Sequence, residues 1–320
     1  MCYSAQIWAN YKKYVRAWGA DIDIQQFVRL YWERGSTDSR IRIPKAMDAA
    51  FDDPRSDDER KIHGMIREFN AQQATKLEQE LFKQRKRLAE AERTLSTKTT
   101  KAATESKRIA GDKVTWALGK LADLRRTELN DEDSRIFPGW YAPVMIEREG
   151  RRVVVPMRYQ CRVAGAPASN DSKFPGTYNA RRDNLEGFWR RQFGASHAVM
   201  VANAFFENVS RHRMQGRELK DGEKEQNVIL EFRPQPAQDM LIACLWSHWQ
   251  APNESELLSF AAITDEPPAE IAAAGHDRCV IPIKPAHVDD WLHPDAARLT
   301  AQYAILDDRE RPFYEHRLAA

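Results

Sequence analysis

The sequence predicts a protein of mixed α and β structure, with helices concentrated in the first 130 residues and strands after them. A seven-residue repeat of apolar positions, typical of long packed helices, lies before Asn130. After Asn130, short apolar runs alternate with polar turns, which is the pattern of β-strands. With 320 residues, 42% of them hydrophobic and 30% charged, the chain can form one large domain or two ordinary ones.

The first part of the chain predicts short helices followed by a loop. Aromatic and aliphatic anchors recur between residues 3 and 34, which favours helical pieces. The polar, proline-containing stretch from Gly35 to Glu59 predicts a loop with one short helix.

The heptad pattern then predicts two long helices that form an antiparallel hairpin. The first apolar seam consists of Ala74, Leu77, Leu81, Gln84, Leu88, Ala91 and Leu95. The second consists of Ala110, Val114, Ala117, Leu121 and Leu124. The Thr- and Lys-rich stretch from Ser96 to Lys107 predicts the joint between them.

Charge is unevenly distributed along the chain. The formal net charge is only +2, but residues 61–130 contain 16 Lys+Arg against 9 Asp+Glu, so the rest is net acidic by about five charges. We expect the hairpin to be a solvated arm, or an element for self-association or for a protein partner. An arm that touches DNA is the alternative.

Six apolar runs predict strands in the second part. They are Val153–Pro156, Ala198–Ala202, Val228–Phe232, Leu241–Leu245, Leu258–Thr264 and Cys279–Ile283. Pro285 is expected to open a short helix from Ala286 to Leu292, and Pro294 or Asp295 a final one.

Several classes of protein are excluded by simple patterns. No run of about 18 apolar residues predicts a membrane span, and the N-terminus lacks the features of a secretory signal. Few cysteines and no export signal indicate the cytoplasm. We expect no metal and no cofactor, because the cysteines lack C-x-x-C spacing and three histidines lack ligand spacing. These residues are Cys2, Cys161, Cys244, Cys279, His197, His212 and His248.

Cys2 has special chemistry if Met1 is removed, which its small side chain favours. The mature residue then has a free α-amine and a thiol, which together capture an aldehyde. The amine forms a Schiff base, and the thiol closes a five-membered thiazolidine ring with the effective molarity of an intramolecular attack. Both groups are partly nucleophilic near neutral pH. Taken alone, a cysteine at this position is more often there by chance.

Three downstream segments favour a functional role for Cys2 over a chance occurrence. They are T-Y-N-A-R at Thr177–Arg181, V-A-N-A-F-F-E-N-V at Val201–Val209 and G-H-D-R-C-V-I at Gly275–Ile281. With the initial Met-Cys, they resemble the four signature blocks of the SRAP family, the SOS-response-associated peptidase or abasic-site-processing family, and order and spacing fit from the second block onward. P-M-R-Y at Pro156–Tyr159 is similar to the M-R-W-G of that family.

The resemblance covers Met1 to about Ser4 and Pro138 to Leu292 and implies an α+β fold. Its core would be a curved, barrel-like antiparallel β-sheet with flanking helices. Residues 1–19 and 131–320 would form the catalytic domain. Residues 20–130 have no counterpart in compact members, so we expect a helical insertion with the long α-helical hairpin.

The resemblance also implies catalytic roles for Cys2, Asn179, Glu207 and His276. Asn179 would hold the amine and thiol of Cys2, although an Asx-turn is the ordinary role of such an asparagine. Glu207 ends an apolar run, where burial would raise its pKa for proton shuttling, unless it is a solvated strand end. His276 would protonate the sugar ring oxygen and help open the abasic sugar to its aldehyde; a structural histidine is the alternative.

Three further residues would contact DNA. Arg181 and Arg278 resemble phosphate contacts of the family, and their planar guanidinium groups suit that role. An ordinary surface arginine is the alternative for Arg181, and Arg182 beside it is a competitor. Tyr159 stands where the family often has tryptophan and would stack on a base of the single strand.

The chain departs from the family at several positions. Tyr3-Ser4 follows Cys2 where many members have Gly-Arg, which predicts that one phosphate contact near the nucleophile is missing. Asn203 and Asn208 replace the usual aspartate and tryptophan, and Cys279-Val280 replaces Met-Pro. These changes concern DNA affinity and substrate preference more than the chemical core.

The expected function is covalent capture of abasic sites in single-stranded DNA during the DNA-damage or SOS response. The protein would be a hydrolase (peptidase) or lyase, cytoplasmic and nucleoid-associated when bound to DNA. The alternative is an N-terminal cysteine peptidase or amidohydrolase, including self-processing of Met1, in which the α-amine is the base. A third hypothesis is a scaffold without catalysis, in which the hairpin binds a partner.

Overall fold

The computed structural model describes residues 3–36, 40–252 and 254–319. The chain divides into two compact units. The first comprises the chain up to Leu30, Arg40–Asp53 and everything from Asn130 onward, and the second comprises residues 31–39 and Pro54–Leu129.

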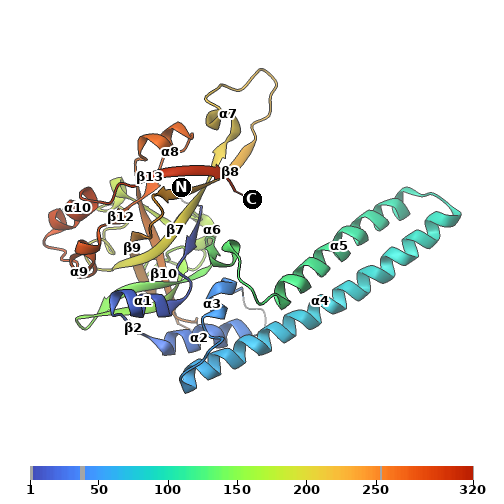
Figure 1. Ribbon diagram of the computed structural model, residues 1–320, viewed down its shortest axis with the longest axis horizontal. Helices are drawn as coiled ribbons and strands as arrows, with labels where there is room; N and C mark the ends of the chain where they lie inside the picture. The colour runs from blue at the N-terminus through green and yellow to red at the C-terminus, as the bar shows by residue number, and fades with distance from the viewer. Residues whose placement is uncertain (1–2, 37–39, 253, 320) are drawn as a thin grey trace. The chain divides into compact units, whose positions relative to one another are not determined.

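One large, mostly antiparallel sheet forms the first unit (Figure 1). Within the described residues its strands are β1 (Ser4–Ile7), β2 (Asp21–Ile22), β3 (Arg135–Ile136), β4 (Tyr141–Arg148), β5 (Arg151–Tyr159), β6 (Asn179–Arg181), β7 (His197–Ser210), β8 (Asn227–Gln235), β9 (Met240–Trp249), β10 (Leu257–Asp265), β11 (Cys279–Val280), β12 (Pro282–Ile283) and β13 (Phe313–Leu318). The parallel pairs are β5 with β10, β6 with β10 and β2 with β5.

The strands follow a partial ring and not a clean barrel. Pairing runs β9–β10–β5–β4–β7 and returns from β7 to β9. The link between β4 and β7 is short, at Met145 and Val199. The hydroxyl of Tyr14 joins the two strands here. It donates to the carbonyl of Pro143 on β4 and accepts from the N–H of Val201 on β7. This arrangement confirms the predicted α+β fold with a curved antiparallel core.

Short helices flank the sheet (Figure 1). They are α1 (Tyr11–Trp18), α2 (Ile24–Gly35), α3 (Lys45–Ala49), α6 (Asn170–Lys173), α7 (Arg211–Met214), α8 (Ala269–Ala273), α9 (Val288–Leu292) and α10 (Leu299–Asp307). No helix of the described residues is both long and apolar enough to span a membrane. The helix α9 is fixed to the sheet by Trp291, which is fully buried and donates its indole N–H to the carbonyl of Ala198.

The second unit contains the predicted hairpin of two long helices, α4 (Asp57–Thr97) and α5 (Lys101–Arg125), which lie side by side (Figure 1). Leu81, Ala117 and Leu121 form its buried core, and further seam residues pack against them. The apolar seam therefore faces inward, as the heptad pattern predicts.

The predicted joint of the hairpin was too long. The helix α5 begins at Lys101, so most of the Thr- and Lys-rich stretch is helical. The Thr100 side chain accepts a hydrogen bond from the N–H of Ala103 and caps the helix, and Ala103 is buried. Similarly, α4 begins at Asp57 within the predicted loop, because Ser56 caps it and acidic residues fill its first turn.

The strand predictions were right in place but incomplete. All six predicted runs lie in strands, although Ile281 separates β11 from β12 within the last run. The N–H of Ile281 donates to the carbonyl of Ile263 on β10, and its carbonyl accepts from the N–H of Ala243 on β9. The first residues were predicted to be helical, but Ser4–Ile7 is a strand, buried between β3 and β7. The last helix begins at Leu299, because Asp295 instead accepts the N–H of Ala297 in a turn.

Candidate functional site

Glu207 lies on β7 beside the beginning of the described chain. On one side β7 pairs with β1, with Phe206 opposite Ser4, and on the other side Glu207 is opposite Leu230 of β8. The N–H of Tyr3 donates to the carbonyl of Phe206 at 3.2 Å. The Glu207 side chain is fully buried, so the structure places a carboxyl group in the protein interior next to the start of β1.

His276 approaches Glu207 from the segment between α8 and β11. Its Nε2 lies 3.2 Å from a carboxyl oxygen of Glu207, and its side chain is 8% exposed. Gly275 makes this approach possible. Its φ is +91°, and a Cβ there would lie 3.1 Å from Val209 on β7 and 2.9 Å from Arg213. The turn at Gly275 therefore packs tightly against the end of β7 and brings the imidazole to the carboxyl group.

Burial disfavours the charged form of both members of this pair. It raises the pKa of Glu207 well above its ordinary value and lowers the pKa of His276. The Nδ1 of His276 lies 2.9 Å from the carbonyl of Arg278, which can only accept a hydrogen bond, and 3.3 Å from the N–H of Arg278, which can only donate one. The shorter distance favours a proton on Nδ1. A proton on Nδ1 leaves Nε2 as an acceptor for the protonated carboxyl group. The pair thus stores one proton that can pass between carboxyl and imidazole.

Asn179 is buried on β6, and the hydrogen bonding of its side-chain amide is unusual. Neither its amide oxygen nor its amide nitrogen has a hydrogen-bond partner among the described residues. Such buried polar groups are rare in native structures and indicate a missing partner. The strand β10 lies between β6 and β11, since Ala262 is opposite Asn179 and Thr264 is opposite Val280. Asn179 and His276 are thus on segments at opposite edges of β10.

The two arginines expected to bind phosphate differ in their surroundings. Arg181 is exposed and forms an ion pair with Asp183, so a phosphate must compete with that carboxylate. Its neighbour Arg182 is tied to Asp307 and lies 3.6 Å from Asp265. Arg278 is largely buried, with a side chain 16% exposed, and lies 3.6 Å from the carboxylate of Asp277.

Tyr159 lies in the core. Its ring is fully buried and contacts the rings of Tyr178 at 5.6 Å and Phe260 at 5.2 Å. In this conformation the ring offers no face to a base. An aromatic residue at the end of strand β5 can fill the interior of the sheet as readily as it can line a surface.

Cys2 lies outside the described residues. The other cysteines are buried, and burial raises their thiol pKa values, that of Cys161 to about 12. Cys244 and Cys279 are shifted in the same direction for the same reason. A buried neutral thiol is a poor nucleophile.

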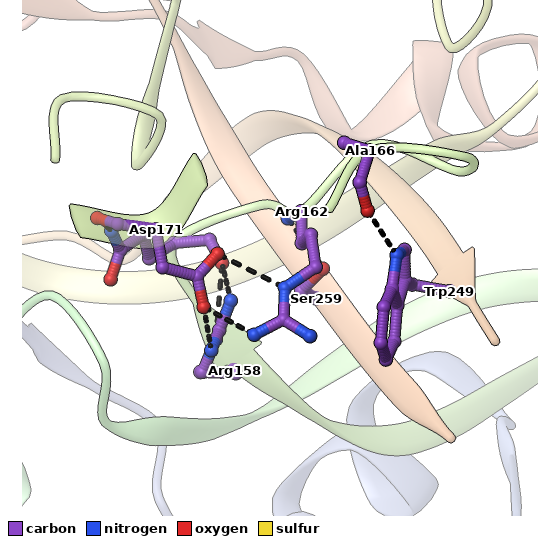
Figure 2. Close-up of polar contacts among 7 residues, drawn as sticks. Arg158, Arg162, Ala166, Asp171, Trp249 and Ser259 are labelled. Carbon is purple, nitrogen blue, oxygen red and sulfur yellow. Dashed lines mark hydrogen bonds and ion pairs between the residues drawn. The ribbon is translucent and has the colours of Figure 1, made fainter. Parts of the chain in front are cut away.

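A polar cluster fixes the loop that leads from β5 to Asn179 (Figure 2). Arg158 and Arg162 both form ion pairs with Asp171 on α6, and Figure 2 shows their guanidinium groups converging on its carboxylate. Gln160 has a φ of 141°, rare for a residue with a side chain, and its carbonyl accepts two hydrogen bonds from Arg158. Arg162 also lies over the ring of Trp249. The cluster therefore holds a strained backbone immediately after Tyr159.

No group of three or more potential metal ligands gathers among the residues that the structure describes. His197 is structural: its Nε2 accepts the N–H of Gly194, its Nδ1 donates to the carbonyl of Trp291, and burial lowers its pKa to about 3.

The comparisons with known proteins identify the family. The model of the SOS response associated peptidase (SRAP) family matches residues 93–317. The chain belongs to the SRAP family. The match includes Asn179, Glu207 and His276, and it begins within α4, so it includes α5. No curated protein matches the chain.

Three solved structures are similar to this SRAP chain over part of its length. A protein from Bordetella bronchiseptica is 16% identical with a TM-score of 0.45, covering 61% of this chain and 90% of the other. A protein from Bacteroides thetaiotaomicron is 12% identical with a TM-score of 0.46, covering 60% and 80%. A phage-related protein from Bordetella bronchiseptica is 18% identical with a TM-score of 0.41, covering 58% and 81%.

Arg135 also lies at this site, although no sequence motif marks it. Its Nε donates to the Ser4 hydroxyl at 3.0 Å. Only the pairing of β3 with β1, in which Arg135 is opposite Gln6, brings it there. Because 131 positions separate Arg135 and Ser4 in the sequence, no local pattern could have found this contact.

Proposed function

We propose that this SRAP protein captures abasic sites in single-stranded DNA through a covalent bond to Cys2, as part of the response to DNA damage. The observation that carries the proposal is the buried pair of Glu207 and His276 beside the start of β1. Cys2 is one peptide bond from Tyr3, and consecutive Cα atoms are about 3.8 Å apart. The N–H of Tyr3, the residue that follows Cys2 in the sequence, bonds next to Glu207 at the carbonyl of Phe206, and this supports the proposal that the pair serves Cys2.

The chemistry requires removal of Met1 by hydrolysis of its peptide bond to Cys2. The free α-amine then attacks the aldehyde of the open abasic sugar, and loss of one water gives an imine. The thiol adds across the imine, so that sulfur bonds to carbon and the thiol proton ends on nitrogen. The product is a five-membered thiazolidine, and no oxidant or reductant is consumed.

The proton shared by Glu207 and His276 serves the proton transfers of this sequence. An abasic sugar is mostly a closed ring, and protonation of its ring oxygen helps it open. Burial raises the pKa of Glu207 and so favours its protonated form, which can pass a proton to His276. Water must also be expelled from the amine–aldehyde adduct, and the same acid serves that step. The buried amide of Asn179, which has no partner among the described residues, is suited to hold the Cys2 amine or thiol.

DNA binding would involve the phosphate groups of one strand. Arg181 is the more accessible contact, and Arg278 would act from a largely buried position. We do not assign base stacking to Tyr159, because its ring is fully buried. We further propose that residues 1–19 and 131–320 carry catalysis and that 20–130 is an insertion whose hairpin binds a protein partner or a second copy. Crosslinking should survive replacement of Lys76–Arg125 by a short Gly/Ser linker.

The second candidate is an N-terminal cysteine peptidase or amidohydrolase, which includes release of Met1. The observation that favours it is the same buried acid–base pair, which could assist attack of the Cys2 thiol on an amide. The two functions differ in what they need from DNA: only the crosslinker depends on a strand that carries an aldehyde.

A denaturing gel tests the proposal. Purified protein is incubated with a single-stranded oligonucleotide that has one abasic site, and with the same oligonucleotide lacking it. We expect a shifted band only with the abasic strand, lost in Cys2→Ser and retained in Cys161→Ser. A band that persists in Cys2→Ser would refute the proposal, and a peptide-cleaving activity without any band would favour the peptidase.

A further inference from the structure

Arg135 places a guanidinium group at Ser4, two residues from Cys2. Its Nε donates to the Ser4 hydroxyl at 3.0 Å. The guanidinium carbon lies 3.6 Å from the ring centroid of Phe206 and 4.9 Å from that of Phe137. These rings hold the plane of the group in a defined orientation.

The charge of Arg135 has no ion-pair partner among the described residues. Its Nη2 also has no hydrogen-bond partner there. The carboxylates that influence it most are Glu132 and Glu231, and Glu231 is bound by Arg233 and Arg317. Arg181, by contrast, has Asp183 as a partner. A partly buried guanidinium with an unsatisfied nitrogen is costly unless an anion binds it.

Aromatic rings continue from Arg135 toward solvent. The ring of Tyr3 is 39% exposed and meets Phe137 edge-on at 5.7 Å, and Phe137 contacts Trp140 at 5.6 Å. An arginine beside exposed aromatic rings is the usual combination for a single nucleic-acid strand, in which phosphates bind the cation and unpaired bases stack on rings.

We infer that Arg135 binds a backbone phosphate next to the captured sugar and that the ring of Tyr3 stacks on the adjoining base of the single strand. This inference rests on the proposed function, because the strand must reach Cys2. Ser4, whose hydroxyl accepts the hydrogen bond from Arg135, is two residues from Cys2 in the sequence. The phosphate contact expected to be missing at position four is thus supplied by a residue on another strand.

Binding of an undamaged single-stranded oligonucleotide, measured by fluorescence anisotropy between 50 and 200 mM salt, tests the inference. Losing one phosphate contact changes the slope of log affinity against log salt by about 0.7. We expect Arg135→Gln to lose that amount, so its deficit against wild type shrinks about 2.6-fold over this range. Arg135→Lys should keep the slope. Arg148→Gln is the matched control, because it removes the same charge from an arginine paired with Asp23.

The Tyr3 ring has a separate test. Tyr3→Leu should weaken binding at least about fivefold, because stacking of one base contributes about 1 kcal/mol or more. Tyr3→Phe should recover the wild-type affinity, because the ring and not the hydroxyl is required. These two variants decide the stacking even if circular dichroism shows that Arg135→Gln does not fold, and the salt slope of Arg135→Lys then tests the contact with the phosphate.

The outcomes separate this inference from the proposed function. Equal salt slopes for Arg135→Gln, Arg148→Gln and wild type would overturn the Arg135 contact. Equal affinity of Tyr3→Leu and wild type would overturn the stacking. If wild type forms no covalent band with an abasic strand, the proposed chemistry fails, while the binding measurements on undamaged DNA still decide the roles of Arg135 and Tyr3.

Discussion

Replacing Glu207 by glutamine removes the stored proton and changes little else. Glutamine has almost the same shape, and its amide can donate to Nε2 of His276, which lies 3.2 Å from the native carboxyl group. It cannot release a proton. Loss of one general acid typically slows a reaction by roughly 10²–10⁴-fold, or about 2.7–5.4 kcal/mol of barrier. We expect thiazolidine formation in Glu207→Gln to slow by that factor.

The same substitution should make the protein more stable, although it slows the reaction. Burial raises the pKa of Glu207, so the contribution of this group to stability is greatest below the ordinary glutamate pKa, about 4.3. This contribution falls as the pH rises from there toward the raised pKa, because only the unfolded chain ionises freely. A glutamine side chain does not ionise, so the variant does not lose stability in this way. Glu207→Gln should therefore be as stable as wild type near pH 4 and more stable than wild type at higher pH, with a difference that grows until the pH reaches the raised pKa.

Two assays check this prediction. Rates come from quenched time points of the abasic oligonucleotide reaction on a denaturing gel, and stabilities from urea unfolding at pH 4, 6 and 8. Glu315→Gln, which neutralises an exposed glutamate on β13, is the control and should match wild type in both. A folded Glu207→Gln that captures abasic DNA at the wild-type rate would remove this carboxyl group from the mechanism.

Three further predictions follow from other sites. Burial lowers the pKa of His197 to about 3, so the protein should lose stability as the pH falls below about 6.5, by about 2 kcal/mol at pH 5. Urea unfolding should show a weaker acid loss in His197→Gln, and an unchanged loss would contradict the assignment. Arg181→Ala should reduce the salt slope of single-strand binding by about 0.7, whereas Asp183→Asn should strengthen binding; anisotropy that shows neither effect would remove Arg181 from the interface. Cys244→Ser should retain the covalent band, because its thiol is buried and neutral, and loss of the band in a folded variant would misplace the nucleophile.

Features that depend on local periodicity could be predicted from the sequence. The hairpin is the clearest case, since Leu81, Ala117 and Leu121 repeat at heptad spacing and meet in its core. The strand Ser4–Ile7 could not be found this way. Its serine and glutamine are buried by pairing with β3 and β7, which are distant in the sequence. Short strands of this kind are set by tertiary neighbours rather than by their own residues.

The candidate site was predictable in its residues but not in its geometry. The run Ala204–Phe206 correctly suggested that Glu207 is desolvated, and the structure shows complete burial. The contact with His276 depends on the turn at Gly275, which no pattern specifies. The position of Arg135 could not be predicted from the sequence either, because only a strand pairing brings it to Ser4. Tyr159 is the opposite case, since an aromatic residue expected to face DNA is fully buried in the structure.

The central claim is that Cys2, with Met1 removed, forms the bond to DNA. The most direct measurement is mass spectrometry of the protein after reaction with an abasic single strand, with nuclease digestion of the DNA and proteolysis of the protein. The account predicts one modified peptide that begins at Cys2, with the remaining sugar attached at that residue and Met1 absent. A modification on a lysine or on another cysteine, or an adduct on a chain that still carries Met1, would contradict it.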